Sequence, residues 1–185
     1  MRWAPFFLDP SIPPEGRSRT PQTSGDTPKS HLEEMGEARG IEFRRGRTFT
    51  PNSHLALQAA EFAHDHGDYQ QQQSFHRALF KAHHTDFDNI GELETLVRIA
   101  SEVGFDGEAM REALSDGSYS ERVDGGIEHA REIGVTGIPT FIFNDQYAIV
   151  GAQEYEAFEQ MMTRLGARKR DGGAADAASD PGDSA

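Results

Sequence analysis

The segment from Gly134 to Phe141 holds the residues whose types and spacing most directly suggest chemistry. It places the Ile138-Pro139 bond between a Thr-Gly pair and an apolar run typical of a β-strand. Proline lowers the cost of a cis peptide bond enough for a fold to fix that isomer, and a cis bond here turns the backbone of Ile138 outward. We expect Ile138 to offer its N–H and C=O to the backbone of a peptide or of glutathione. The other residues of this expected substrate-binding site are Thr136, Gly137, Pro139 and Thr140.

Three further observations limit this interpretation. An isolated Gly-Ile-Pro-Thr sequence is also typical of a trans proline at the start of a strand. Asn52 could line a groove that faces the proline loop, or it could cap the helix that follows it. The chain contains no cysteine, although thiol chemistry requires a thiolate. The sequence therefore predicts residues that hold a substrate without a sulfur that reacts with it.

Two histidine-rich segments could bind a metal ion. Residues 64–66 (His-Asp-His) and 83–88 (His-His-Thr-Asp-Phe-Asp) bring imidazole and carboxylate groups to expected helix ends, and such groups bind zinc or iron where three or more converge. Neighbouring histidines on a helix point in different directions. We therefore expect solvated helix ends, with no metal and no other cofactor. The sequence also lacks a nucleophile elbow and a phosphate-binding glycine loop.

The amino-acid composition limits the kinds of partner that we expect for this chain. The 185 residues include 31 acidic and 18 basic side chains, which gives a formal net charge of -13. A surface of this sign repels nucleic acids and anionic membranes, so neither is an expected partner. The only lysines are Lys29, Lys81 and Lys169, a balance that we interpret as halophilic because concentrated salt screens the repulsion. No apolar run has the length of a membrane span, and the first residues lack a secretion-signal pattern, which favours a cytoplasmic location.

Hydrophobic periodicity predicts the elements of the first third of the chain. Residues 3–8 (Trp-Ala-Pro-Phe-Phe-Leu) have the composition of a short buried strand that ends at an Asp-Pro pair. An irregular loop follows. Thr27 is the expected N-cap of a short helix, with Pro28 at its first position and Gly40 at its end.

The rest of the chain is predicted to be mainly helical. Residues 52–133 show apolar side chains at helical spacing in five successive segments, with Asp106 and Ser118 as the expected caps of the last two. The period then changes, because two four-residue apolar runs flank Asn-Asp-Gln at 144–146 as an antiparallel hairpin. A helix over residues 155–165 completes the predicted elements.

This order of elements, together with the segments that carry it, resembles the DsbA family of thioredoxin-fold oxidoreductases. The likeness is greatest to its FrnE-like branch, in which a helical bundle is inserted between two halves of the sheet. Residues 3–10 and 12–16 are similar to that branch's second strand and following loop, and residues 52–56 are similar to the start of its insertion. Residues 134–141 resemble its cis-proline loop, and residues 151–153 resemble the end of its last strand.

The resemblance implies an α/β fold with a thioredoxin-like (DsbA-like) sheet and a helical insertion. It divides the chain into an N-terminal strand of the thioredoxin-like half at 1–10, a loop with a short helix at 11–51, the helical insertion at 52–133, the cis-proline loop with the hairpin and C-terminal helix at 134–166, and a disordered acidic tail at 167–185.

The sequence also departs from the family pattern. Members begin with a strand and a Cys-x-x-Cys at a helix N-terminus, where the helix dipole stabilises the thiolate. This sequence begins after the position of that strand, so we expect the first strand and the active-site helix to be missing. The missing strand would lie between residues 3–8 and 140–143. The expected function is that of a redox-inactive homologue of DsbA-like thiol-disulfide oxidoreductases, with no catalytic residue. Its expected partner is a protein or peptide thiol or disulfide, or glutathione.

Two alternatives stay open. Kappa-class glutathione transferases and 2-hydroxychromene-2-carboxylate isomerases are relatives that use serine in place of the first cysteine. They typically carry Asp and Arg shortly after the glycine that ends the last strand, where this chain has Gln153 and Glu154, so the FrnE-like branch is favoured. The other alternative is a non-catalytic module that binds peptides in the same groove.

Overall fold

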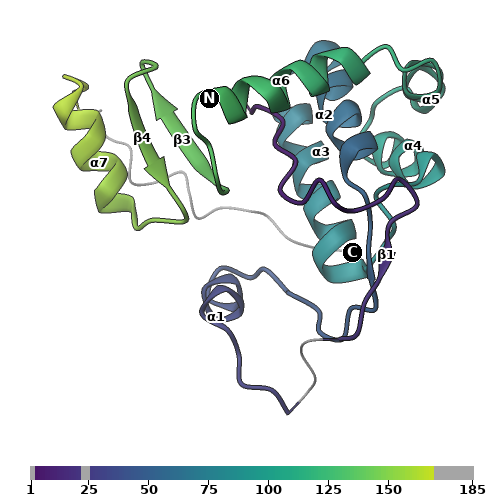
Figure 1. Cartoon of the computed structure of the whole chain (residues 1–185), viewed down its shortest axis with the longest axis horizontal. Coiled ribbons are helices and arrows are strands. Elements are labelled where there is room, and N and C mark those ends of the chain that lie inside the picture. Colours follow the sequence, from purple (N-terminus) through teal and green to yellow (C-terminus); the bar gives the residue numbers. More distant parts are fainter. Residues whose placement is uncertain (1–2, 22–25, 169–185) are drawn as a thin grey trace, which may run out of the picture. The chain divides into compact units, whose positions relative to one another are not determined.

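The structure, a computed structural model, describes residues 3–21 and 26–168 (Figure 1). The chain forms two compact units, Met1–Thr136 and Gly137–Ala185. The elements of the first unit are β1 (Arg17–Ser18), α1 (His31–Glu37), β2 (Phe49–Thr50), α2 (His54–His66), α3 (Tyr69–Lys81), the π-helical turn η1 (Ala82–Asp86), α4 (Leu93–Glu102), α5 (Gly107–Ser115) and α6 (Ser120–Glu132). Those of the second unit are β3 (Thr140–Phe143), β4 (Tyr147–Val150) and α7 (Tyr155–Arg164).

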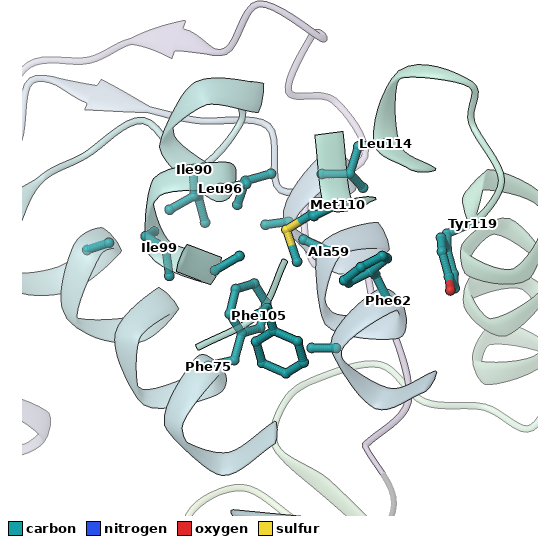
Figure 2. Packing of buried hydrophobic residues seen from close by; sticks show 14 residues of the cluster. Ala59, Phe62, Phe75, Ile90, Leu96, Ile99, Phe105, Met110, Leu114 and Tyr119 are labelled. Carbon is teal, nitrogen blue, oxygen red and sulfur yellow. The ribbon is translucent and has the colours of Figure 1, made fainter. Parts of the chain in front are cut away.

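The core of the first unit lies among helices α2 to α5, where the helical periodicity predicted it. Phe75, Leu96 and Met110 are fully buried, and Figure 2 shows their side chains pointing into one interior together with Phe105 and Ala59. The rings of Phe75 and Phe105 meet edge to face at 5.7 Å between centroids, a preferred arrangement of aromatic pairs. The predicted helices between residues 52 and 133 are therefore all formed, and the apolar faces of α2 to α5 build a shared core.

Capping side chains set two helix starts differently from the sequence-based prediction. The predicted cap Thr27 is wrong, because α1 begins after Ser30. Ser30 forms a capping box with Glu33. The Glu33 N–H donates to Ser30 Oγ at 3.3 Å, and the Ser30 N–H donates to Glu33 Oε2 at 2.7 Å. Two satisfied N–H groups outweigh a proline at the first position.

The predicted cap of α6 is also wrong, whereas that of α5 is confirmed. Helix α6 has Tyr119 at its N-cap position and no side-chain cap, so Ser118 lies one residue too early, and its hydroxyl donates to the carboxylate of Asp116. Asp106 accepts from the N–H groups of Glu108 and Ala109 at 3.0 Å each and caps α5 as expected.

The predicted strand over residues 3–8 is not formed. These residues are irregular and belong to the same compact unit as the helices. Their side chains lie against helices instead: the ring of Trp3 meets that of His76 at 5.1 Å, and a Cβ on Gly126 would lie 2.6 Å from Pro5 Cγ. A strand needs a neighbour for its N–H and C=O groups, and among the described residues none pairs with this segment.

The C-terminal elements of the prediction do form. Strands β3 and β4 pair in the antiparallel register that joins Phe143 to Tyr147 and Thr140 to Val150. Asn144 and Asp145 adopt φ values of 51° and 53°, which a tight hairpin turn requires and which these residue types tolerate. The predicted acidic tail falls on residues that the structure does not describe, apart from 167 and 168, which lie outside any helix or strand.

The segment before β2 is held against η1 by a contact between an arginine and a histidine. Arg47 donates to the carbonyl of His83 and, at 3.1 Å, to its Nδ1. Burial, followed by the charges of Arg47 and His84, lowers the pKa of His83 to about 3. His83 is therefore neutral at pH 7, and protonating it would replace the acceptor that Arg47 uses with a second donor.

Replacing Phe75 with alanine should lower the free energy of unfolding by about 3–5 kcal/mol, because it removes a buried ring and leaves a cavity. Urea denaturation followed by circular dichroism measures this. The control is Phe80→Ala on the same helix, whose side chain is 55% exposed and whose removal should cost less than about 1 kcal/mol. Equal losses in the two variants would contradict the described core.

The free energy of unfolding should fall as the pH is lowered from 7 to 5. The unfolded chain protonates His83 near its ordinary pKa of 6.5, whereas the folded chain does so only near pH 3, so the unfolded state binds more protons in this window. His83→Gln, which keeps an acceptor for Arg47, should reduce the slope by about 1 kcal/mol per pH unit. Denaturation at several pH values tests this, and identical slopes for both proteins would rule the mechanism out.

Candidate functional site

The proline loop connects α6 to β3. The helix ends in a turn in which the N–H of Val135 donates to Ala130 O at 2.9 Å and Gly134 has a φ of 78°, the left-handed conformation for which glycine is suited. The peptide bond between Ile138 and Pro139 is cis, the isomer that the sequence predicts. The Ile138 side chain is 52% exposed. The loop thus displays an apolar side chain and its backbone at the start of β3.

Two hydrogen bonds fix the end of this loop onto the hairpin. The Thr140 hydroxyl donates to Gly137 O at 2.7 Å. The N–H of Gly151 donates to Pro139 O at 2.8 Å, which extends the β3–β4 ladder by one pair. Because residue pairs alternate between bonded and non-bonded in an antiparallel ladder, this bond also fixes which backbone groups point away from β4.

The outer edge of β3 is unpaired. The bonded pairs are those of Pro139, Phe141 and Phe143, so the N–H and C=O groups of Thr140 and Ile142 point away from β4. Within the described residues, no strand pairs with this edge. An edge of this kind is a template for a further strand.

The face of the hairpin opposite α7 is also open. Phe141 meets Phe158 of α7 edge to face at 4.8 Å, so one face of the hairpin is covered by this helix. On the alternate positions, Ile142 and Val150 are 46% and 58% exposed. None of the described residues from 137 to 168 is buried, which leaves this unit with an exposed apolar surface beside an open strand edge.

Asn52 belongs to the first unit, and its amide is engaged on both sides. Its Nδ2 donates to Ile12 O at 2.8 Å and to Pro13 O at 3.3 Å. Its Oδ1 accepts from the N–H of His54 at 2.9 Å. Asn52 therefore ties the N-terminal segment to the start of α2, which fits the capping alternative. Its role in a substrate groove stays a prediction.

A polar cluster that the sequence analysis missed lies between α2 and α6. His54 Nε2 and Asp124 Oδ1 are 2.8 Å apart, and His54 Nδ1 lies 3.1 Å from Nε2 of Gln58. This arrangement holds the imidazole in one orientation, as in sites that transfer protons. Gln58 is buried, and its Oε1 has no hydrogen-bond partner among the described residues. No local motif signals the cluster, since 70 positions separate His54 from Asp124 in the sequence.

The two histidine-rich segments do not converge on a metal site. The imidazole of His64 contacts the neighbouring carboxylate of Asp65 at 3.3 Å, and Asp65 is engaged by Arg122 at 2.8 Å. His83 is held by Arg47 as described. Across residues 3–21 and 26–168, no group of three or more metal-binding side chains is close enough to hold an ion.

Solved structures identify the class of fold. A "probable DsbA oxidoreductase" from Streptomyces coelicolor superimposes with a TM-score of 0.65 and 26% identity, over 75% of this chain and 59% of that one. A "putative protein disulfide isomerase" from Nitrosomonas europaea gives a TM-score of 0.59 at 15% identity, over 73% of this chain and 70% of its own, and shows the fold alone. This chain therefore has a DsbA-like thioredoxin fold, as the sequence predicted, and spans less than two thirds of the Streptomyces structure.

Sequence comparison then gives the family. The model of the DSBA-like thioredoxin domain matches residues 1–163, so the chain belongs to that family. It is also 28% identical over 165 residues to the uncharacterized protein YwbO of Bacillus subtilis (strain 168), covering 88% of this chain and 80% of that protein. None of the described helices has both the length and the apolar composition needed to span a membrane.

Replacing Gln58 with methionine should change the free energy of unfolding by less than about 1 kcal/mol, because removing a buried acceptor without a partner offsets the loss of the hydrogen bond between Gln58 Nε2 and His54 Nδ1, while the volume is kept. Urea denaturation of both proteins measures the difference. A loss of more than about 2 kcal/mol would contradict this balance between the two polar atoms of the Gln58 amide.

Proposed function

We propose that this chain binds an extended polypeptide along the outer edge of β3, next to residues 136–140. The observation that carries the proposal is the unpaired row of backbone groups on Thr140 and Ile142. An added strand gains affinity from main-chain hydrogen bonds, and side-chain contacts then give it specificity. Thr136, Gly137, Ile138, Pro139 and Thr140 are the proposed contact residues, with Asn52 as a further candidate.

The exposed side chains along this edge support an apolar segment as the substrate. Ile138 and Ile142 are 52% and 46% exposed, and an incoming strand would cover them while pairing with β3. Burial of apolar area of this kind contributes roughly 25 cal/mol per Å². Binding therefore combines hydrogen bonds, which do not depend on sequence, with contacts that select apolar side chains.

The same proposal holds that the 185-residue chain does not exchange disulfides by itself. A thiolate is the nucleophile of this reaction, and the sequence has no cysteine. Methionine thioethers cannot replace it, because they form no thiolate. The chain would then contribute the binding of a substrate and none of the bond-breaking chemistry.

Membership of the DSBA-like family supports protein or peptide thiols and disulfides as the substrate class. Assignment to the FrnE-like branch is part of the proposal and depends on the placing of five helices, α2 to α6, between the N-terminal segment and the proline loop. A cytoplasmic location belongs to it as well. The net charge of -13 argues against nucleic acid as the ligand.

Ile142→Pro should weaken binding of an extended peptide by about tenfold, because proline removes one outward N–H and its ring blocks a neighbouring strand. The ladder to β4 does not use that N–H. The probe is fluorescently labelled, S-alkylated insulin B chain, and the measurement is fluorescence anisotropy. Ala148→Pro is the matched control, because it makes the same change on the outer edge of β4 and should leave the affinity unchanged.

Equal weakening by both variants, or no saturable binding by the unmodified chain, would contradict the proposal. Circular dichroism verifies that both variants fold. An insulin-reduction assay with the unmodified chain should show no turnover. Measurable turnover would refute the proposal that a chain without cysteine cannot exchange disulfides. Calorimetric binding of glutathione, together with no binding of the insulin B chain, would favour the glutathione-dependent alternative.

A further inference from the structure

Three arginines gather around one pocket of the first unit, far along the sequence from the proline loop. The pocket has a volume of about 300 Å³, at the lower end of the range for small-molecule sites. Its lining residues are Arg19, Ser30, Leu32, Glu33, Phe43, Arg44 and Arg47. Such a concentration of positive charge is unexpected on a chain with a net charge of -13.

No carboxylate among the described residues neutralises these three arginines. Glu33 is the acidic residue of the pocket wall, and its two oxygens are taken by Arg45, at 2.7 and 3.2 Å. One of them also accepts from the Ser30 N–H. This carboxylate is thus committed to holding α1. In the part of the chain that the structure describes, the charges of Arg19, Arg44 and Arg47 are therefore balanced by no carboxylate.

Phe87 positions two of the guanidinium groups. The Cζ atoms of Arg44 and Arg47 lie 5.2 and 4.8 Å from the centroid of its ring, within the range of cation–π attraction. Phe87 follows the π-helical turn η1 and has a φ of 63°, a left-handed conformation that costs free energy for any residue with a side chain. Such backbone outliers are concentrated at ligand-binding sites.

Arg19 is close enough to Arg47 for its charge to affect the Arg47 guanidinium. Burial and, after it, the charge of Arg19 lower the pKa of the Arg47 guanidinium, which nevertheless stays protonated. Arg47 is also anchored by its two hydrogen bonds to His83. Burial lowers the pKa of His83 and that of His84, so neither imidazole carries charge at pH 7. The like charges of Arg19 and Arg47 repel each other, and a bound anion would relieve this repulsion.

We propose that this arginine pocket binds the phosphate group of a small phosphorylated molecule. Guanidinium groups present N–H donors in a fork that matches phosphate oxygens, and a phosphate ester carries close to two charges where a carboxylate carries one. Leu32 and Phe43 add an apolar wall that suits the remainder of such a ligand. Nucleic acid is excluded as the source of the phosphate, because the rest of the chain would repel a polyanion.

Titration calorimetry with inorganic phosphate at low ionic strength tests the proposal. The unmodified chain should show saturable binding with a Kd below about 1 mM. Arg44→Gln and Arg19→Gln, whose side chains make no ion pair in the described residues, should each weaken this binding by about tenfold or more. Arg131→Gln is the matched control, because it removes the same charge from an exposed position on α6 and should change Kd by less than about twofold.

Three results would overturn the proposal. One is the absence of saturable phosphate binding by the unmodified chain. Another is equal weakening by Arg131→Gln, which would mean that phosphate responds to net charge alone. The third is binding of succinate as tightly as phosphate, which would show a site for any dianion. Circular dichroism of each variant separates a lost site from a lost fold, and the exposed position of Arg44 makes it the variant least able to disturb the fold.

Discussion

The pairing of backbone groups between strands is the constraint on which the rest of this structure depends. Each strand must direct its N–H and C=O groups to a neighbour or to water, and the described residues contain two separate antiparallel pairs. Residues 3–8 have the composition of a strand without a neighbour, and they lie irregularly against helices. The outer edge of β3 has the complementary property, because β3 is a formed strand that has a neighbour on one side only among the described residues. In the part of the chain that the structure describes, both features reflect the lack of a further strand to pair with.

Buried side chains are distributed unequally between the two units. The first unit therefore supplies a stable core, and the second supplies exposed apolar groups for binding. The first unit encloses a core of fully buried side chains such as Phe75 and Leu96. The second has a hairpin and one helix without a single buried residue among those described, and two-stranded hairpins are at best marginally stable alone. Its apolar groups are therefore available to a partner. The arginine pocket lies within the first unit, where Phe87 and His83 hold two of its charged groups in place.

The local sequence pattern correctly predicted those features that short-range interactions determine. The core positions of α4 and α5, the turn at Asn144 and the cap at Asp106 follow from periodicity and from short-range hydrogen bonds. The strand at residues 3–8 failed because a strand depends on its neighbour as much as on its own side chains. The contact of His54 with Asp124, like the arginine pocket, joins elements that are distant in sequence. The spacing of residues along the chain does not predict such contacts. The proline loop was found because its signal lies within a single segment.

Gly126 shows how two demands compete at one residue. Its missing side chain lets Pro5 approach the axis of α6, since a Cβ there would lie 2.6 Å from the proline ring. Glycine inside a helix costs about 0.5–1 kcal/mol relative to alanine. The helix thus gives up intrinsic stability so that the N-terminal segment can lie across it. A larger residue at this position would favour the isolated helix and displace its neighbour, so evolution or engineering cannot optimise the two independently.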